Sequence, residues 1–539
     1  MSFFRSLYVP TAAFLLCLAT VATPVQLAAA AESKLPFNDI ADSYAKGAIV
    51  HLSTLGIVSG NGSGKFEPRK SVTRAEWVSM LDRLFAIEPV NGAIPAFADV
   101  PNTVWHYPWV QSAVELGLAT GTSPSLFQPD KKVSRQEAAV FLVRALKQSL
   151  AAASSSNDKT YMDSDRIASW ALPSVRQLQK LNVMNGDGGT FRPEDSMTKQ
   201  EAAALLDKVL QRNAWSAQFQ AAPAASIQLG WQYGQTTVQF ERQVAQSNVN
   251  TLSPRWFFLG QAGTLEDSAD APLVAWAHAQ GKKVWAMVGN HSDPSLTGKT
   301  ISDATQRKIF IQALADAVRK YGLDGLNIDF ENVSPQDRNG MTLFVSELAA
   351  ALRAIPAKLS VNVSPDLGTD WTDAFDYAAL GNDADYIVLM GYDEHWEGDA
   401  EAGSVSSLPW LRSGLDALLD KVPANKVILA MPLYTRDWYA GAAATMSTEW
   451  SLIRQNDQVR ALHLKPDWNE RLAQYSASYW SLGVQHRIWL EDGRSLSRKM
   501  ELGLVKNIAG FAYWYMGGDS PDVWASMRNR LRFSTYTFL

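Results

Sequence analysis

The sequence predicts a multidomain protein in which an all-α domain of three repeats precedes an α/β barrel of the (β/α)8, or TIM-barrel, type. Two observations lead to this prediction. Three similar segments recur at regular spacing in the first part of the chain, and beyond them short apolar stretches alternate with helix-like stretches. The length of 539 residues is too great for one ordinary hydrophobic core.

Residues 1–31 have the pattern of a secretory signal peptide. Arg5 precedes an apolar run, and alanines follow it, so we expect cleavage after Ala30 or Ala31; an uncleaved anchor is the alternative. The only cysteine, Cys17, lies in this segment, and the mature chain should therefore hold no disulfide and no thiolate metal site. Export without cysteines suggests a bacterial protein with no membrane span in its mature form.

The charge balance excludes one class of partner. The chain has 49 Lys and Arg against 54 Asp and Glu, a net charge of −5. Because nucleic-acid-binding domains carry a basic footprint, no nucleic acid partner is expected.

Each of the three repeats combines a turn with the start of a helix. The turns are Gly64-Lys-Phe66-Glu-Pro68, Ser125-Leu-Phe127-Gln-Pro129 and Gly189-Thr-Phe191-Arg-Pro193, and the helix starts are Thr73-Arg-Ala-Glu76, Ser134-Arg-Gln-Glu137 and Thr198-Lys-Gln-Glu201. Thr or Ser followed three residues later by Glu is a capping box, which predicts a helix in each repeat. Capping explains the hydroxyl and the Glu, but not the basic residue after each hydroxyl: Arg74, Arg135 and Lys199.

Together with the openings Phe37-Asn-Asp39, Phe97-Ala-Asp99 and Tyr161-Met-Asp163, these repeats resemble the S-layer homology module, over residues 35–90, 95–149 and 159–212. The resemblance implies a three-lobed helical prism whose grooves hold an anionic, typically pyruvylated, secondary cell-wall polymer. Arg74 and Arg135 match the arginine that meets the acid, and a guanidinium fork suits a carboxylate. Lys199 departs from the pattern, which leaves binding by the third groove open. The implied location is the surface of a bacterium with a Gram-positive type of wall.

Residues 151–158 are expected to form a loop, residues 213–225 a linker, and residues 226–539 a single barrel with a small α+β insertion at about 439–509. Eight apolar stretches would form the barrel strands: 227–230, 251–259, 283–288, 325–330, 358–363, 386–390, 427–431 and 510–515.

The stretch Asp324-Gly-Leu-Asn-Ile-Asp-Phe-Glu331 places Asn327, Asp329 and Glu331 on one face of a strand, because alternate side chains share a face. The three residues fall where the strand leaves the barrel, the end at which such barrels carry catalysis. A solvated strand end is the structural alternative.

This stretch, with Met390-Gly-Tyr392-Asp393 and Gly510-Phe-Ala-Tyr-Trp514, resembles the motifs of glycoside hydrolase family 18, the chitinase-like barrels. The stretches Val361-Asn-Val-Ser-Pro365, 385–395 and Pro432-Leu-Tyr-Thr-Arg436 are similar to those of bacterial spore-cortex and cell-wall N-acetylglucosaminidases. The resemblance implies retaining, substrate-assisted hydrolysis. Glu331 would be the acid and base, Asp329 would orient the acetamido NH of the substrate, and Tyr392 would bind its carbonyl.

Asn327 replaces the middle aspartate of the family motif. It removes a carboxyl that could share a proton with Asp329, so our hypothesis is that Asp329 stays ionised through more of the cycle. The cell-wall subgroup has Asn here as well, so we do not interpret the change as inactivation.

Six further residues are predicted to bind substrate, with packing as the alternative for each. They are Trp514, Asp393, Met390, Tyr434, Arg436 and Trp231. Trp514 would form the floor of the pocket and stack on a sugar ring. His291 and His395 are isolated, so no catalytic metal and no cofactor are expected.

The leading prediction is therefore a secreted, wall-anchored enzyme that cuts β-1,4 bonds after N-acetylglucosamine in peptidoglycan. A chitinase and a catalytically silent, lectin-like wall protein are the alternatives. Whether the cleft is endo- or exo-acting, and the oligomeric state, stay open.

Overall fold

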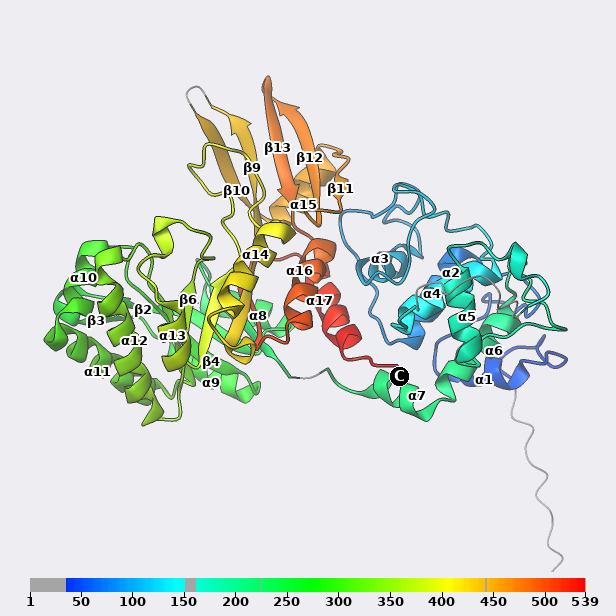
Figure 1. The fold of residues 1–539 in the computed structure, drawn as a ribbon, viewed down its shortest axis with the longest axis horizontal. Coiled ribbons are helices and arrows are strands. Elements are labelled where there is room, and N and C mark those ends of the chain that lie inside the picture. Colours follow the sequence, from blue (N-terminus) through cyan, green and yellow to red (C-terminus); the bar gives the residue numbers. More distant parts are fainter. Residues whose placement is uncertain (1–34, 151–160, 224, 442–443, 539) are drawn as a thin grey trace, which may run out of the picture.

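A computed structural model describes residues 35–150, 161–223, 225–441 and 444–538. The predicted signal peptide and the loop at 151–158 lie outside these residues. Figure 1 shows a helical domain at one end of the molecule, a barrel at the other, and a second sheet that projects beside them. Within the described part of the chain, no helix combines the length and the apolar character that a membrane crossing requires.

The helical domain consists of three helix pairs, one pair for each repeat. The pairs are α1 (Lys46–Thr54) with α2 (Arg74–Leu84), α3 (Tyr107–Glu115) with α4 (Arg135–Ala145), and α5 (Leu172–Lys180) with α6 (Lys199–Leu210). The predicted capping boxes are confirmed at Thr73, Ser134 and Thr198, where the hydroxyl accepts from the amide of the Glu three residues later. In each repeat an aspartate of the opening accepts two backbone N–H groups of the turn, for example Asp39 from Phe66 and Glu67, both at 2.8 Å. Repeated local chemistry thus produces repeated structure.

Eight parallel strands close the predicted barrel. Their order is β1-β14-β8-β7-β6-β5-β4-β2, and β1 pairs with β2 to complete the circle. They are β1 (Ile227–Gln232), β2 (Thr251–Leu259), β4 (Lys283–Gly289), β5 (Gly325–Asp329), β6 (Lys358–Val363), β7 (Tyr386–Met390), β8 (Val427–Pro432) and β14 (Gly510–Trp514). A short β3 (Leu265–Asp267) runs antiparallel to β2. The strands agree with the predicted stretches to within two residues.

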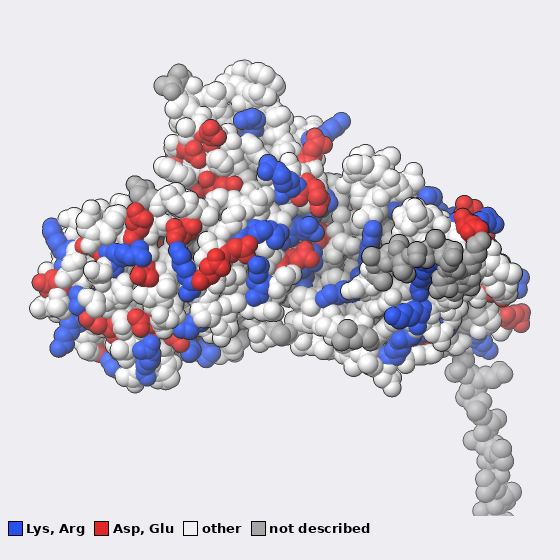
Figure 2. Space-filling view, in the orientation of Figure 1, with Lys and Arg blue, Asp and Glu red and all other residues white. Residues whose placement is uncertain are grey.

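The helices that surround the barrel are α8 (Thr237–Gln246), α9 (Ala271–Ala279), α10 (Pro294–Ser302), α11 (Ala304–Tyr321), α12 (Arg338–Arg353), α13 (Tyr377–Asp383), α14 (Leu408–Leu419), α16 (Gly493–Val505) and α17 (Pro521–Ser534). The barrel interior is a packed core that includes Trp285, Met287, Val388 and Ile428. On the face shown in Figure 2, positive and negative side chains are interspersed over the barrel.

A second, antiparallel sheet lies between β8 and α16 in the sequence, where the insertion is predicted. Its order is β10-β9-β13-β12-β11. The strands are β9 (Tyr434–Ala440), β10 (Thr445–Ser451), β11 (Asp467–Asn469), β12 (Gln474–Ser481) and β13 (Val484–Leu490), and α15 (Leu452–Ala461) accompanies them. The sheet stands above the barrel in Figure 1.

The chain after the barrel returns to the helical domain. Phe533, Tyr536 and Phe538 belong to the hydrophobic core of that domain. Helix α7 (Asn213–Gln220), which forms within the predicted linker, packs Phe219 against Phe538 with ring centroids 5.7 Å apart. Contacts across the sequence thus join the helical domain to the end of the barrel (Figure 1).

Polar contacts reinforce this junction. The Nε and Nη2 atoms of Arg528, on α17, donate hydrogen bonds of 2.8 to 3.1 Å to the Glu88 carboxylate. The Asn529 amide bonds both the N–H and the carbonyl of Glu88, at 2.7 and 2.8 Å. The Tyr536 hydroxyl donates to the Phe85 carbonyl at 2.7 Å.

Candidate functional site

The acidic residues of the predicted motif lie at the carboxyl end of β5. Asn327 and Asp329 are buried in the barrel, with exposed fractions of 0% and 9%, whereas Glu331 follows the strand and is exposed. Glu331 is therefore accessible to a ligand at the barrel mouth, with Asp329 beneath it.

Residues that follow β4 hold Glu331 in place. The Ser292 hydroxyl donates to its Oε2 at 2.7 Å. The buried Asn290 amide accepts from the Glu331 N–H at 3.0 Å and donates to its carbonyl at 2.8 Å. His291 and Ser292 have φ of 55° and 52°, and this left-handed backbone turns the chain so that Ser292 faces Glu331.

The surroundings of Asp329 favour its protonated form. Burial, followed by the charge of Glu331, raises the pKa of Asp329 to about 7. A hydrogen bond from Asn362 Nδ2 to Asp329 Oδ1, 2.9 Å long, and the charge of Arg255 act in the opposite direction. Burial and Glu331 therefore oppose the ionised form that we expect from the replacement of the middle aspartate by Asn327, and that hypothesis stays a prediction.

Aromatic rings border the acids. The rings of Trp514, at the end of β14, and Tyr392 are stacked with centroids 6.3 Å apart, and Tyr233 lies 5.5 Å from Trp514. Burial and the nearby Asp329 hold the pKa of Tyr392 well above its ordinary value, so its hydroxyl remains a hydrogen-bond donor. The arrangement provides flat apolar surface and a donor beside two carboxyl groups, which suits a sugar ring.

The predicted substrate contact of Trp231 is wrong. Its ring is 0% exposed and lies behind Trp514, and its Nε1 donates to Asn327 Oδ1 at 2.8 Å. Nothing in the sequence distinguishes a tryptophan in the interior of the barrel from one at its mouth.

The other predicted substrate residues surround the mouth of the barrel at different depths. Met390 is half-buried at the end of β7, and Asp393 has a left-handed φ of 61°. Tyr434 is 2% exposed; its hydroxyl donates to Asp393, and its ring meets the Tyr392 ring edge-on with centroids 6.2 Å apart. Arg436 is 7% exposed and donates to Ser447 in the second sheet at 3.2 Å. Substrate contact by Met390, Asp393 and Arg436 stays a prediction.

The basic residues of the repeats join one repeat to the next. Arg135 donates from Nε to the Phe191 carbonyl at 2.9 Å and from Nη2 to the Asn185 carbonyl at 3.1 Å. Arg74 makes the equivalent bonds to Phe127 and Thr120, both at 2.9 Å. These arginines are only 6% and 3% exposed, so they have a structural role whether or not they also bind a ligand.

Lys199 is placed similarly, yet it makes weaker contacts. Its Nζ lies 3.9 Å from carboxylate oxygens of Glu67 and Glu76 and 5.8 Å from the centroid of the Phe66 ring. The difference from the arginines follows from the lack of a guanidinium fork.

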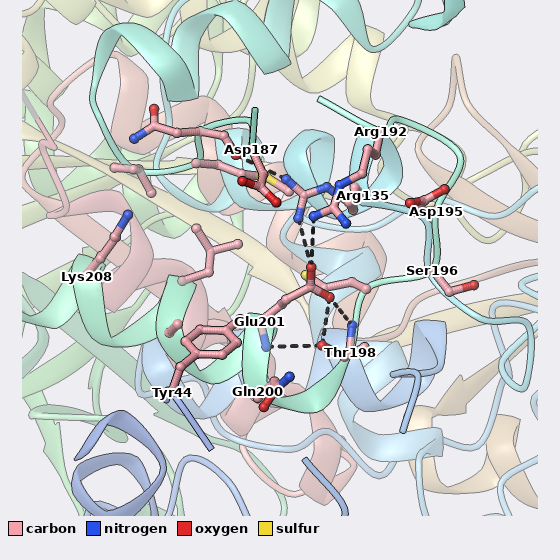
Figure 3. A pocket seen from close by; sticks show the side chains of 16 residues that line it. Tyr44, Arg135, Asp187, Arg192, Asp195, Ser196, Thr198, Gln200, Glu201 and Lys208 are labelled. Carbon is pink, nitrogen blue, oxygen red and sulfur yellow. Dashed lines mark hydrogen bonds and ion pairs between the residues drawn. The ribbon is translucent and has the colours of Figure 1, made fainter. Parts of the chain in front are cut away.

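A pocket of about 730 Å³ opens beside Arg135. Figure 3 shows Arg135 and Arg192 directed toward Glu201, with Tyr44 and Lys208 at the edges. The Glu201 carboxylate lies 3.3 Å from Arg135 and 3.5 Å from Arg192. Sequence reasoning missed Tyr44 of the first repeat and Arg192 and Lys208 of the third. Three cations, Arg135, Arg192 and Lys208, line the pocket together with three carboxylates, Asp187, Asp195 and Glu201. The guanidinium groups can pair with an acidic group of a ligand, but the pocket carries no excess of positive charge.

Among the residues described, no group of three His, Cys, Asp or Glu side chains is arranged to hold a metal ion.

Comparison with known protein families assigns both regions. Residues 255–519 match the glycosyl hydrolases family 18, and residues 36–76, 96–139 and 160–203 match the S-layer homology domain. Both predicted resemblances are confirmed.

Similar proteins include the uncharacterized glycosylase YvbX of Bacillus subtilis, 29% identical over 57% of this chain and 92% of the relative. A cortical fragment-lytic enzyme of Bacillus cereus is 27% identical over 49% of this chain, which spans only 63% of that relative. Two solved structures share the barrel fold, each with a TM-score of 0.53 and coverage of 57% of this chain. They are a chitinase from Chromobacterium violaceum, 22% identical over 99% of its chain, and the Bacillus cereus spore cortex-lytic enzyme SleL, 23% identical over 75% of its chain.

Proposed function

In this chain a glycosyl hydrolases family 18 domain follows three S-layer homology domains, and we propose that the protein is a cell-wall-anchored N-acetylglucosaminidase. In this proposal the barrel hydrolyses β-1,4 bonds after N-acetylglucosamine in peptidoglycan. The helical domain holds the secreted enzyme at the surface of a bacterium with a Gram-positive type of wall. The sequence similarity of the barrel to a cortical fragment-lytic enzyme supports a substrate in the cell wall.

The observation that carries the proposal is the pair Asp329 and Glu331. The two carboxyl groups lie two residues apart at one strand end, with Glu331 exposed and Asp329 buried below it. A double displacement with an enzyme nucleophile requires carboxyl groups that flank the sugar from opposite sides, which this arrangement does not favour. Substrate-assisted hydrolysis needs only one proton-transfer group and one orienting group.

In the first step, Glu331 protonates the leaving glycosidic oxygen while the 2-acetamido oxygen of the substrate attacks the anomeric carbon. Asp329 accepts the acetamido N–H, and the Tyr392 hydroxyl donates to the acetamido oxygen. An oxazolinium ion forms and the aglycon leaves. In the second step, Glu331 removes a proton from water, which attacks the anomeric carbon, opens the ring and retains the configuration.

The role of Glu331 is tested by the products that the mature protein and its Glu331→Gln variant release from peptidoglycan and from chitin oligomers. We expect wild-type fragments with N-acetylglucosamine at the new reducing end, and loss of turnover with retained sugar binding in the variant. Preference for chitin would favour the chitinase. Binding without cleavage of either polymer would favour the silent lectin, and a variant of unchanged rate would refute the acid assignment.

For the helical domain we propose that the grooves bind an anionic wall polymer, with Arg74 and Arg135 as the buried cations and Lys199 as a weaker third. Because Arg74 and Arg135 also join neighbouring repeats, replacing either by Ala could weaken attachment by destabilising the domain as well as by removing a ligand contact. Lys208 lies at the edge of the Arg135 pocket, and Arg192 pairs with Glu201 of its own repeat. Replacing these two residues leaves the bonds of Arg74 and Arg135 between repeats in place, so they make cleaner tests.

Lys208→Glu combined with Arg192→Ala should weaken attachment to purified walls by at least about tenfold, since two cations facing the ligand are lost. The matched control is Lys299→Glu, an exposed lysine on α10 of the barrel, which should attach normally. Equal attachment of the groove variant and the wild type would contradict binding in this pocket.

A further inference from the structure

A continuous chain of buried hydrogen bonds runs through the barrel interior to Asp329. Asn327 Oδ1 accepts from Trp231 Nε1 at 2.8 Å and from the Ser253 hydroxyl at 3.3 Å. Asn327 Nδ2 donates to Asn362 Oδ1 at 2.7 Å, and Asn362 Nδ2 donates to Asp329 Oδ1 at 2.9 Å. Asn327 also donates to the Ser360 hydroxyl at 2.9 Å, so its amide uses both donors and both acceptor positions.

The direction of this chain is fixed at its inner end. The indole nitrogen of Trp231 can only donate, so the Asn327 atom that faces it must be the oxygen. The Asn327 amide nitrogen therefore faces Asn362 and donates, so the Asn362 atom that accepts this hydrogen bond must be its oxygen. The remaining end of the Asn362 amide, the N–H, is directed at Asp329. A reversed Asn362 would place two donors together and two acceptors together at a buried site, which is costly.

We propose that Asn362 is a positioning residue for Asp329: through an amide orientation set by Trp231 and Asn327, it holds the carboxylate in one rotamer and favours its charged form. The inference rests on the proposed function, in which Asp329 accepts the acetamido N–H of the substrate. With Oδ1 engaged by Asn362, Oδ2 is the oxygen left for the substrate. Asn362 is 4% exposed and acts through Asp329.

The electrostatics agree with this geometry. The hydrogen bond from Asn362 lowers the pKa of Asp329 against the effects of burial and of Glu331. A hydrogen bond donated to a carboxylate stabilises the charged form, so removing the donor should raise the pKa. Asn327 acts one step further away, because Asn362 lies between it and Asp329.

The experiment compares three single variants with the wild type. Asn362→Ala removes the donor, and Asn362→Asp keeps the shape but places a second carboxyl against Asp329. Ser360→Ala is the matched control, because Ser360 is equally buried on β6 and bonds Asn327 without touching Asp329. Circular dichroism verifies that each variant folds, and the isosteric Asn362→Asp keeps the test available if the alanine variant does not fold.

The first readout is the pH dependence of kcat and KM on the polymer that the wild type cleaves. We expect the acidic limb of kcat/KM to move to higher pH by about one unit in Asn362→Ala, and further in Asn362→Asp, so that activity below the limb falls about tenfold. Ser360→Ala should keep the wild-type limb. Limbs that coincide in all four proteins would overturn the inference, since they would leave Asn362 a packing role only.

A second readout does not depend on catalysis. The carboxyl carbon signal of Asp329, assigned by its loss in Asp329→Asn, can be followed by 13C NMR over the pH range. Its midpoint should rise in both Asn362 variants and stay in place in Ser360→Ala. An unchanged midpoint refutes positioning by Asn362 even if the wild type is an active glucosaminidase. A raised midpoint supports it even if the wild type cleaves neither polymer, in which case the proposed function alone fails.

Discussion

Ser292 shows how single residues outside the acidic motif determine the geometry of the site. Its hydroxyl donates to Glu331 Oε2 at 2.7 Å, and Asn290 fixes the backbone of Glu331 from both sides. Both residues follow β4, the neighbouring strand of β5. The orientation of Glu331 is thus imposed by a different strand from the one that carries it.

We predict that Ser292→Ala lowers kcat about tenfold with little change in KM. A hydrogen bond to a charged group contributes about 1.5–3 kcal/mol, and its loss lets the Glu331 carboxyl rotate away from the glycosidic oxygen. Steady-state kinetics on the preferred polymer would measure the effect. Ser302→Ala, whose hydroxyl bonds Asp337 instead, should behave as the wild type. A Ser292→Ala enzyme with normal kcat would show that Glu331 is held without it.

Only part of the site could be predicted from sequence, for a geometric reason. Alternation along one strand brings Asn327 and Asp329 to the same side, and this needs no knowledge of neighbouring strands. Asn362 lies on β6 and Ser292 follows β4, so their contacts with β5 and Glu331 depend on how the barrel strands are arranged. A signal for Asn362 was nonetheless present, because Ser360 and Asn362 are alternate polar residues in the otherwise apolar β6.

At the scale of helices and strands, the positions of the elements could be predicted because local sequence signals, apolar runs and capping boxes, determine them. The barrel strands are short apolar runs bounded by turns, so their positions were predicted to within two residues. The three capping boxes predicted the starts of α2, α4 and α6. Helix α7 was missed because its residues, rich in Ala and Gln, lack a clear apolar period, and its Phe219 packs only against distant parts of the chain.

Removing one cap should loosen one helix. We predict that Thr198→Ala destabilises α6 by about 1 kcal/mol, because the amide of Glu201 loses its acceptor. Hydrogen exchange of peptides from residues 199–210 should then be faster. Thr54→Ala at the end of α1, where the hydroxyl bonds only the Val50 carbonyl, should leave exchange in α6 unchanged. Identical exchange in Thr198→Ala and the wild type would show that tertiary packing alone starts the helix.

On the scale of the whole molecule, acidic residues are buried where the helical domain meets the barrel. Glu115 ends α3 and faces α16 and α17, and Asp492 caps α16 by accepting from the Ser495 N–H at 2.9 Å. Burial raises the pKa of Glu115 to about 8 and that of Asp492 to about 7. Both carboxyls are therefore largely neutral in the folded protein at mildly acidic pH.

This burial predicts a pH dependence of stability. A raised folded pKa gives stability that is fully present below the unfolded values, near pH 4, and is lost as the pH rises through about 7 to 8. We expect the Tm to fall between pH 5 and 8, and to fall less in the double variant Glu115→Gln, Asp492→Asn. Calorimetry would measure both, with the exposed Asp42→Asn as control. An equally steep fall in the double variant would assign the pH dependence to other groups.

The seating of Phe533, Tyr536 and Phe538 in the helical core has a consequence for the order of events when the protein is made. The helical domain is synthesised first, and its interior stays incomplete until residues 533–538 have been synthesised. The barrel strands lie between the repeats and those residues in the sequence, so the barrel is synthesised before the helical core can be completed. The helical domain should therefore reach full stability only when residues 533–538 are present, so a chain interrupted within the barrel would carry a weakened helical domain.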